Sequence, residues 1–191
     1  MIATLMRSGF QYCPEFIDAT NETELIACVQ TLPFREFEFH GYLGKRRVVS
    51  FGWRYEYSGR GELKRVDEVP DFLLDLRRRA AKFAQLKPEL LQQVLVTEYR
   101  AGSGIGWHRD KPVFDQVVGI SLLAPCVLRF RRKVVGNVGA SSRAKWERAN
   151  VVAEPRSAYL LEGPVRSEWQ HSILRVDELR YSITFRSLRQ T

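Results

Sequence analysis

"QVLVTEYRAGSGIGWHRD" spans residues 93–110, and the chain changes character across it. β-Branched and aromatic residues over 93–100 are typical of a strand, and the glycine-rich segment 101–106 allows a sharp turn after it. Many short strands at close spacing favour a β-sandwich or a jelly-roll barrel. The further strands expected after this stretch lie at 117–123, 126–132, 158–163, 167–173 and 180–188.

The residues before this stretch predict two helices as well as strands. Apolar residues recur at helical spacing over 21–32, with Thr20 or Asn21 as the N-cap, and again over 71–84. Two helices followed by many strands predict an α+β fold in which the N-terminal helices pack on one sheet. The strands expected in this part lie at 34–41 and 46–57.

The composition of the chain limits its class and its partners. Its 191 residues suit a single domain, and no apolar run reaches the roughly 18 residues of a membrane span. A formal net charge of +8 favours polyanionic partners, nucleic acid first. Scattered cysteines predict reduced thiols and a cytoplasmic protein, and the N-terminus shows no secretory signal pattern. We expect a monomer.

Two histidines and an aspartate form a candidate metal site. His108 and Asp110 are spaced to lie on one face of a strand, and His171 lies in a second strand-like segment. Two imidazoles and one carboxylate leave positions open on an ion, which suits non-haem Fe(II) with a co-substrate and O₂. Zinc can occupy the same ligands, so these residues alone do not fix the metal. The third histidine, His40, fits a structural role.

The segment "RYSITFR" at 180–186 alternates polar and apolar residues. Its polar face is either exposed to solvent or lines a polar barrel interior. In the second case, two guanidiniums about 20 Å apart along a straight strand can grip opposite ends of an elongated dicarboxylate. The residues of this polar face are Arg180, Ser182, Thr184 and Arg186.

These motifs, in this order, resemble the AlkB family of Fe(II)- and 2-oxoglutarate-dependent dioxygenases. "EYRAGSGIGWHRD" resembles the family's turn into its metal motif, and "GPVRSEWQHSI" resembles the segment around its second metal histidine. The resemblance implies a double-stranded β-helix, or jelly-roll. It also implies one domain over 1–191, with substrate recognition and helical support over 1–92 and a catalytic core over 93–188.

The resemblance also implies roles for the motif residues. His108, Asp110 and His171 would be the iron ligands, with 2-oxoglutarate and O₂ as the other reactants. Arg180 would bind the distal carboxylate of 2-oxoglutarate, and Arg186 would lie near its C1 carboxylate.

Three more residues would contact the co-substrate. Tyr99 would donate a phenolic hydrogen bond to 2-oxoglutarate. Thr97 and Ser182 stand where the family often has asparagine. Because both are shorter, they would weaken these contacts or leave them to water.

Substrate residues are less well marked. Trp53 and Tyr55 would form a wall that stacks a flipped base, or belong to the core. Arg129, Arg131 and Trp146 would contact phosphates and bases, or form a solvated basic surface.

The segment 136–150 is expected to be a polar insertion that forms a mobile hairpin or loop. Together these motifs and the resemblance predict oxidative demethylation of N-alkylated DNA or RNA. The alternatives are action on a protein or on a tRNA modification. A zinc hydrolase is a further alternative, but it would give Arg180 and Arg186 no role. A nucleic-acid-binding module with an inactive site is another, but it would give the complete set of metal ligands and both arginines no role.

Overall fold

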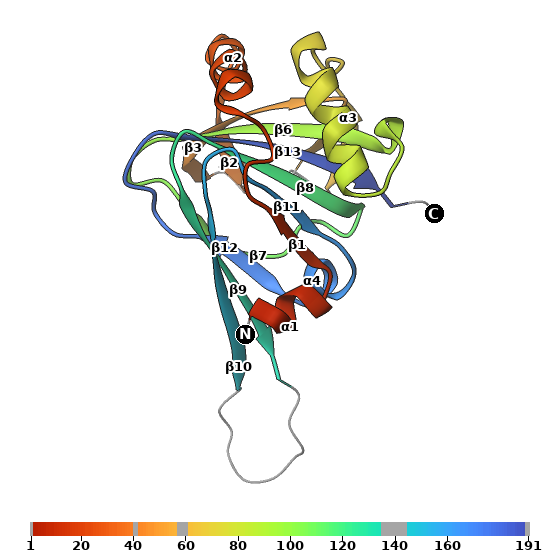
Figure 1. Cartoon of the computed structure of the whole chain (residues 1–191), viewed down its shortest axis with the longest axis vertical. Coiled ribbons are helices and arrows are strands. Elements are labelled where there is room, and N and C mark those ends of the chain that lie inside the picture. The colour runs from red at the N-terminus through yellow and green to blue at the C-terminus, as the bar shows by residue number, and fades with distance from the viewer. Residues whose placement is uncertain (1, 40–41, 57–60, 135–144, 190–191) are drawn as a thin grey trace.

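Two antiparallel sheets face each other in the structure, a computed structural model that describes residues 2–39, 42–56, 61–134 and 145–189 (Figure 1). The larger sheet has seven strands in the spatial order β1 (Phe10–Cys13), β11 (Ala158–Leu161), β8 (Phe114–Leu122), β13 (Arg180–Leu188), β6 (Leu91–Tyr99), β3 (Tyr42–Phe51) and β2 (Arg35–Phe39). The smaller sheet has the order β10 (Trp146–Ala153), β9 (Cys126–Lys133), β12 (Gln170–Ile173) and β7 (Ile105–His108). β4 (Trp53–Glu56) and β5 (Glu62–Arg65) form a separate hairpin.

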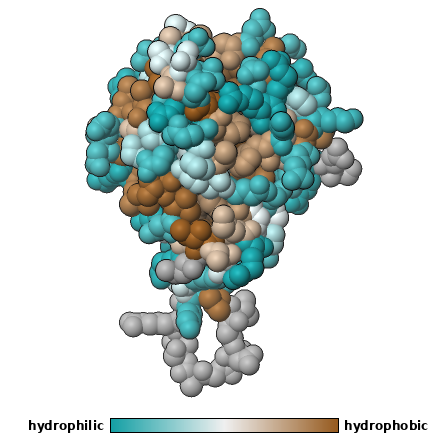
Figure 2. All heavy atoms as spheres, viewed as in Figure 1, coloured by the Kyte–Doolittle hydropathy of each residue, from teal (hydrophilic) through white to brown (hydrophobic). Residues whose placement is uncertain are grey.

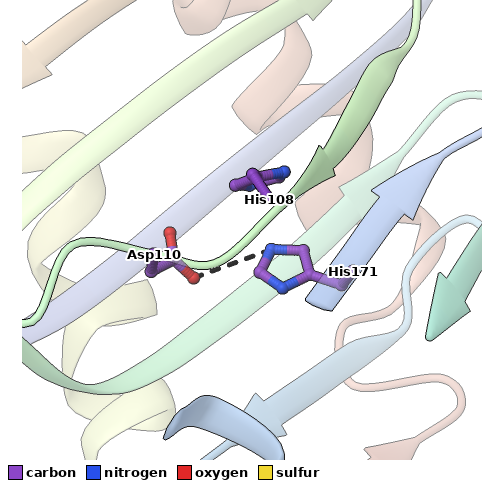
Figure 3. A group of neighbouring side chains, drawn as sticks. All are labelled: His108, Asp110 and His171. Atoms are coloured by element: carbon purple, nitrogen blue, oxygen red, sulfur yellow. Dashed lines mark ion pairs between the residues drawn. The ribbon is translucent and has the colours of Figure 1, made fainter. Parts of the chain in front are cut away.

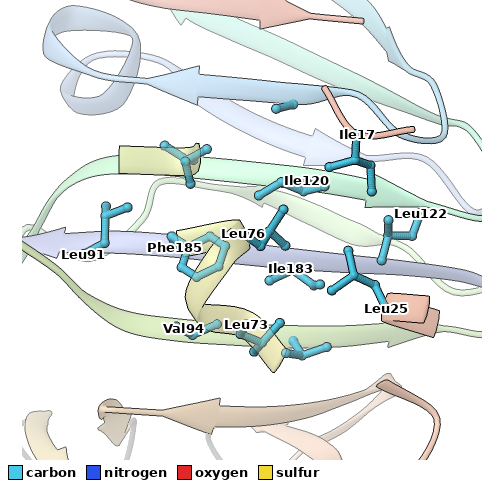
Figure 4. Close-up of a cluster of buried hydrophobic side chains, with 14 of the residues drawn as sticks. Ile17, Leu25, Leu73, Leu76, Leu91, Val94, Ile120, Leu122, Ile183 and Phe185 are labelled. Atoms are coloured by element: carbon cyan, nitrogen blue, oxygen red, sulfur yellow. The ribbon is translucent and has the colours of Figure 1, made fainter. Parts of the chain in front are cut away.

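The two main helices lie on the outer face of the seven-stranded sheet, as predicted. α2 (Ala19–Val29) and α3 (Leu74–Phe83) cover β6 and β13 on the side away from the smaller sheet (Figure 1). Their apolar residues pack against those of the central strands, and Figure 4 shows this cluster. Removing so much apolar surface from water stabilises this layer. The labelled members include Leu25, Leu73, Leu76, Ile120, Ile183 and Phe185.

The alternating polar and apolar residues of the central strand β13 lie on its two faces. Tyr181, Ile183 and Phe185 point into the cluster beneath the helices. The alternate side chains of Ser182 and Arg186 line a cavity between the two sheets. The polar face of this strand is therefore an interior lining and not a solvated surface.

A second core lies between the sheets and next to the cavity. Phe10 of β1 and Phe130 of β9 meet with ring centroids 5.3 Å apart in an edge-to-face arrangement. Trp169 is fully buried in the same cluster. Two short helices, α1 (Ile2–Arg7) and α4 (Gly163–Ser167), lie beside it. Figure 2 shows hydrophilic residues over most of this face, with hydrophobic ones gathered lower down towards α1 and β1.

Several predicted boundaries were wrong, for local reasons. The first helix begins at residue 19, because Asp18 is its N-cap and accepts a hydrogen bond from the Asn21 amide at 2.7 Å. The predicted strand 46–57 breaks at Gly52, whose φ of 72° suits glycine. The predicted helix 71–84 starts as a 3₁₀ turn, η1 (Asp71–Leu73), and a second such turn, η2 (Pro88–Leu90), precedes β6.

The polar segment 136–150 was expected to be a hairpin or loop, and part of it is a strand. Its end belongs to β10, which pairs with β9 from Trp146 opposite Lys133. Residues 135–144 and His40 lie outside the described residues. Strand 158–163 ends at residue 161 and strand 167–173 begins at residue 170, because α4 lies between them. Within the described ranges, no helix is long and apolar enough to cross a membrane.

Candidate active site

Two adjacent strands of the smaller sheet and one loop bring the predicted ligands together. His108 ends β7 and lies directly opposite His171 of β12, with ring centroids 4.2 Å apart. Asp110 follows in the loop after β7, and its Oδ2 lies 3.7 Å from His171 Nε2 (Figure 3). One donor atom from each residue lies within 4.8 Å of the others. The strand ends before Asp110, so the loop, and not a shared strand face, completes the group.

Two arginines hold Asp110 in place. Arg186 Nη2 lies 3.5 Å from its Oδ1. Arg166 of α4 is buried, and its guanidinium donates to the backbone carbonyls of Asp110 at 3.2 Å, Phe114 at 2.6 Å and Lys111. We did not identify Arg166 from the sequence, because an arginine in a short segment carries no sign that it will be buried.

The electrostatics of the group favour cation binding. Burial alone would raise the pKa of Asp110, but the nearby Arg186, His171, His108 and Arg166 charges hold it well below its usual range. Burial lowers the pKa of His171 to about 4, although Asp110 opposes this shift. At neutral pH the carboxylate is therefore ionised and the His171 imidazole neutral, which are the forms that bind a metal ion.

The group borders a cavity of about 1200 Å³ between the sheets. His108, Asp110 and His171 all line it, and so does Arg186. Two imidazoles and one carboxylate at the wall of a cavity match the donor set of non-haem Fe(II) sites with open positions. The residues present therefore fit Fe(II).

The two predicted co-substrate arginines differ in their surroundings. Arg186 donates to Gln93 Oε1 at 2.8 Å from Nη1 and faces Asp110. Arg180 is fully buried, with Nε donating to Ser121 Oγ at 3.2 Å. Its Nη1 and Nη2 have no hydrogen-bond partner among the described residues. A buried guanidinium in this state is costly unless an anion joins it, so its surroundings fit a carboxylate ligand. Arg180 itself is not among the residues that line the cavity, although its neighbours Tyr99 and Ser182 are.

The register of β13 and β6 places the other predicted contacts beside these arginines. Arg180 lies opposite Tyr99, and its Cζ is 4.9 Å from the tyrosine ring centroid. Ser182 lies opposite Thr97, so the two positions that depart from the family pattern are direct neighbours. All three of Tyr99, Thr97 and Ser182 line the cavity.

The structure divides the residues predicted to contact substrate. Tyr55 lines the cavity, whereas Trp53 is not among its lining residues and has Arg65 Cζ 5.8 Å from its ring. The remaining three lie on the far face of the smaller sheet. They are Arg129, Arg131 and Trp146, and they are joined there by Trp107, which sequence reasoning missed.

Comparison with known proteins identifies the family. The model of the 2OG-Fe(II) oxygenase superfamily matches residues 9–186. The "Alkylated DNA repair protein ALKBH8 homolog" of Arabidopsis thaliana is 28% identical over 95% of this chain, which spans only 56% of that protein. The "Probable RNA/DNA demethylase ALKBH6" of Danio rerio is 27% identical over 64% of this chain and 50% of its own length.

Solved structures share the fold. The structure of OsALKBH1 has a TM-score of 0.66 and 18% identity, covering 95% of this chain and 97% of that one. A Pseudomonas putida prolyl-4-hydroxylase has a TM-score of 0.58 and 14% identity, covering 100% of both chains. These likenesses confirm the predicted jelly-roll, and the family implies Fe(II), 2-oxoglutarate and O₂. The chain thus belongs to the 2OG-Fe(II) oxygenase superfamily, and the AlkB resemblance of its sequence is confirmed.

Proposed function

We propose that this protein is a dioxygenase that removes N-linked methyl groups from DNA or RNA. The observation that carries the proposal is the pairing of the His108–Asp110–His171 group with a buried Arg180 whose Nη atoms lack partners. A zinc hydrolase would use the same three ligands but would leave the charge of Arg180 without a counterion. Support for a nucleic-acid substrate comes from the net charge of +8 and from relatives whose names refer to DNA repair and to RNA/DNA demethylation.

The reaction requires an ion, a co-substrate and O₂ in one cavity. His108, Asp110 and His171 would hold Fe(II), which supplies the oxidising chemistry together with 2-oxoglutarate and O₂. One oxygen atom of O₂ enters the methyl group and the other enters succinate, while CO₂ leaves. The bond between nitrogen and the hydroxymethyl carbon then breaks. The carbon leaves as formaldehyde, and the hydroxyl proton passes to the nitrogen.

The residues of the chain bind and orient these reactants. Arg180 binds the distal carboxylate of 2-oxoglutarate, and Arg186 lies beside Asp110, near the C1 carboxylate. Tyr99 lines the cavity next to Arg180 and donates its phenolic hydrogen to the co-substrate. Tyr55 on the β4–β5 hairpin forms part of the wall against which a methylated base stacks.

Product analysis tests the proposal. The protein is incubated with Fe(II), 2-oxoglutarate and O₂ in the presence of methylated DNA, RNA, tRNA or peptides, and both succinate and formaldehyde are measured. Asp110→Ala removes the anionic ligand and is expected to abolish both products. Full activity of this variant would exclude the ligand assignment. Formaldehyde from methylated peptides alone would show a protein substrate instead.

A further inference from the structure

The outer face of the smaller sheet carries three arginines and two tryptophans side by side. We call this set the Arg–Trp strip: Trp107, Arg129, Arg131, Trp146 and Arg148. On β9 the strip residues alternate with Leu128 and Phe130, which are buried on the inner face. The arginines of the strip and Trp146 therefore lie on the opposite side of the sheet from the candidate iron site.

Two arginines of the strip, Arg129 and Arg131, are held by contacts with neighbouring side chains. Arg131 lies between two indoles, with Cζ 4.3 Å from the Trp107 ring and 4.6 Å from the Trp146 ring. Arg129 Cζ lies 4.8 Å from the same Trp107 ring. The Nε atoms of both donate to side chains of β12, Arg131 to Gln170 at 2.7 Å and Arg129 to Ser172 at 3.0 Å. The Nη edges of both guanidiniums are not used by these bonds.

The charge of the strip is not neutralised within the described residues. In that part of the chain, neither Arg129, Arg131 nor Arg148 forms an ion pair with a carboxylate. Arg132, whose side chain alternates to the other face of β9, pairs with Glu147 at 3.0 Å and Glu168 at 2.9 Å. Arg148 also lies directly opposite Arg131, and like charges in such a position destabilise a sheet. An anionic partner would offset this repulsion.

The strip leads to the mouth of the cavity. β7 is the edge strand of the smaller sheet opposite β10, and it carries Trp107 next to His108. Its pairing with β12 shifts register between His171 and Ile173, so β7 contains one extra residue. This bulge keeps Ile105 and His108 on the inner side while Trp107 meets the arginines outside. Trp107 and His108 both line the cavity.

We propose that the Arg–Trp strip binds the backbone and bases of single-stranded nucleic acid, next to the nucleotide that enters the cavity. Guanidinium edges match phosphate oxygens in a bidentate manner, and indole rings stack on unpaired bases. The strip runs across the sheet from β10 to β7. A nucleic-acid strand bound along it would therefore reach the mouth of the cavity. The identity of the polymer rests on the proposed function, but binding on this face does not require turnover.

A salt titration tests the strip. The probe is an unmodified, fluorescently labelled single-stranded 20-nucleotide oligomer, and affinity is measured from about 50 to 200 mM salt. The variant Arg129→Gln/Arg131→Gln/Arg148→Gln is expected to lose about 10- to 100-fold in affinity, and its log–log salt slope should flatten by about 2. The exposed single change Arg148→Gln should flatten it by about 0.7 without touching the buried side of the sheet.

The matched control removes three charges from the other side of the molecule. Arg78→Gln/Lys82→Gln/Lys87→Gln lies on and after α3, over the outer face of the larger sheet, and is expected to keep wild-type binding and slope. Equal losses in both triple variants would show diffuse charge attraction and overturn the proposal. So would competition by polyglutamate as strong as that by the oligomer, because it would indicate an acidic protein partner.

The result also separates this inference from the proposed function. If the wild-type protein binds the oligomer through the strip but releases no formaldehyde from any methylated nucleic acid, the proposed function fails and the strip stands. If it demethylates nucleic acid but the strip variant binds normally, the strip fails and the function stands.

Discussion

The contacts of Arg180 within the folded chain do not compensate for the burial of its charge. It is fully buried and has one hydrogen bond, from Nε to Ser121, while both Nη atoms lack partners among the described residues. Burying a charge in this way costs stability unless a ligand supplies the opposite charge. The proposed binding of a 2-oxoglutarate carboxylate would account for this otherwise unfavourable arrangement.

Replacing Arg180 by lysine keeps the charge and removes the planar fork. We expect Arg180→Lys to weaken the apparent affinity for 2-oxoglutarate on the order of tenfold or more, because two directed bonds become one point contact. The measurement is 2-oxoglutarate-dependent succinate formation over a range of co-substrate concentrations. Arg77→Lys on α3, an arginine whose buried Nε has no hydrogen-bond partner among the described residues, is the control. An unchanged affinity in Arg180→Lys would contradict the role.

At the scale of elements, a short helix fixes the loop that carries Asp110. α4 contributes Arg166, which donates to three backbone carbonyls between residues 110 and 114. β7 ends at His108, so no strand ladder holds Asp110. Arg166 therefore takes the place of strand pairing in positioning this ligand.

Loss of Arg166 should weaken metal binding more than it weakens folding. Arg166→Met preserves length and burial but removes the guanidinium hydrogen bonds to three carbonyls, and we expect metal affinity to fall about 10- to 100-fold. Co(II) binding by calorimetry, well below the unfolding temperature, checks this, and Arg166→Lys should recover part of the affinity. Arg132→Met, which removes the ion pairs to Glu147 and Glu168, should bind Co(II) normally. Equal Co(II) affinity in Arg166→Met and Arg132→Met would show that Arg166 does not position Asp110.

A bidentate ion pair joins β3 to β6 and predicts a pH dependence. Hydrogen bonds from Arg47, both 2.8 Å long, hold the pKa of Glu98 below its usual 4.5, although burial opposes this shift. Because the folded-state pKa is depressed, the stabilisation is fully present above about pH 4.5 and is lost as pH falls through the folded pKa.

Glu98→Gln should therefore destabilise the protein by about 1–2 kcal/mol at pH 7, and this difference should shrink as pH falls below 4.5. Urea unfolding at a series of pH values measures it. Glu68→Gln, which removes the exposed partner of Arg65, should have little effect at any pH. If Glu98→Gln lowered the free energy of unfolding by the same amount at every pH, then packing, and not charge, would be responsible for the loss.

The elements also show what the sequence can predict. Alternation located β13 and β6, and spacing located both histidines, because each signal lies within one short segment. β10 was not among the predicted strands, because Trp146 pairs with a residue 13 positions earlier, across a segment with no strand pattern of its own. Arg166 was missed because its role depends on a loop over 50 residues away in the chain. The face taken by Arg129 and Arg131 depends on the pairing of β9 and could not be read from alternation alone.

At the scale of the whole molecule, the two sheets contribute different halves of the site. The smaller sheet and its loop carry His108, Asp110 and His171, and the larger sheet carries Arg180 and Arg186 on β13. A metal ion bound by the first group and a dicarboxylate bound by the second would meet in the cavity between the sheets. Ligand binding should therefore tie the sheets together.

This arrangement predicts that metal and co-substrate stabilise the fold cooperatively. Because 2-oxoglutarate would contact both the ion and the arginines, each ligand should bind more tightly when the other is present. The unfolding temperature is measured with Co(II) alone, with 2-oxoglutarate alone and with both, at fixed concentrations, since the shift depends on ligand concentration. The shift with both should exceed the sum of the single shifts, and Arg180→Met should reduce it to about the Co(II) value. Strictly additive shifts would mean that the two halves bind their ligands independently, and would place the co-substrate away from the ion.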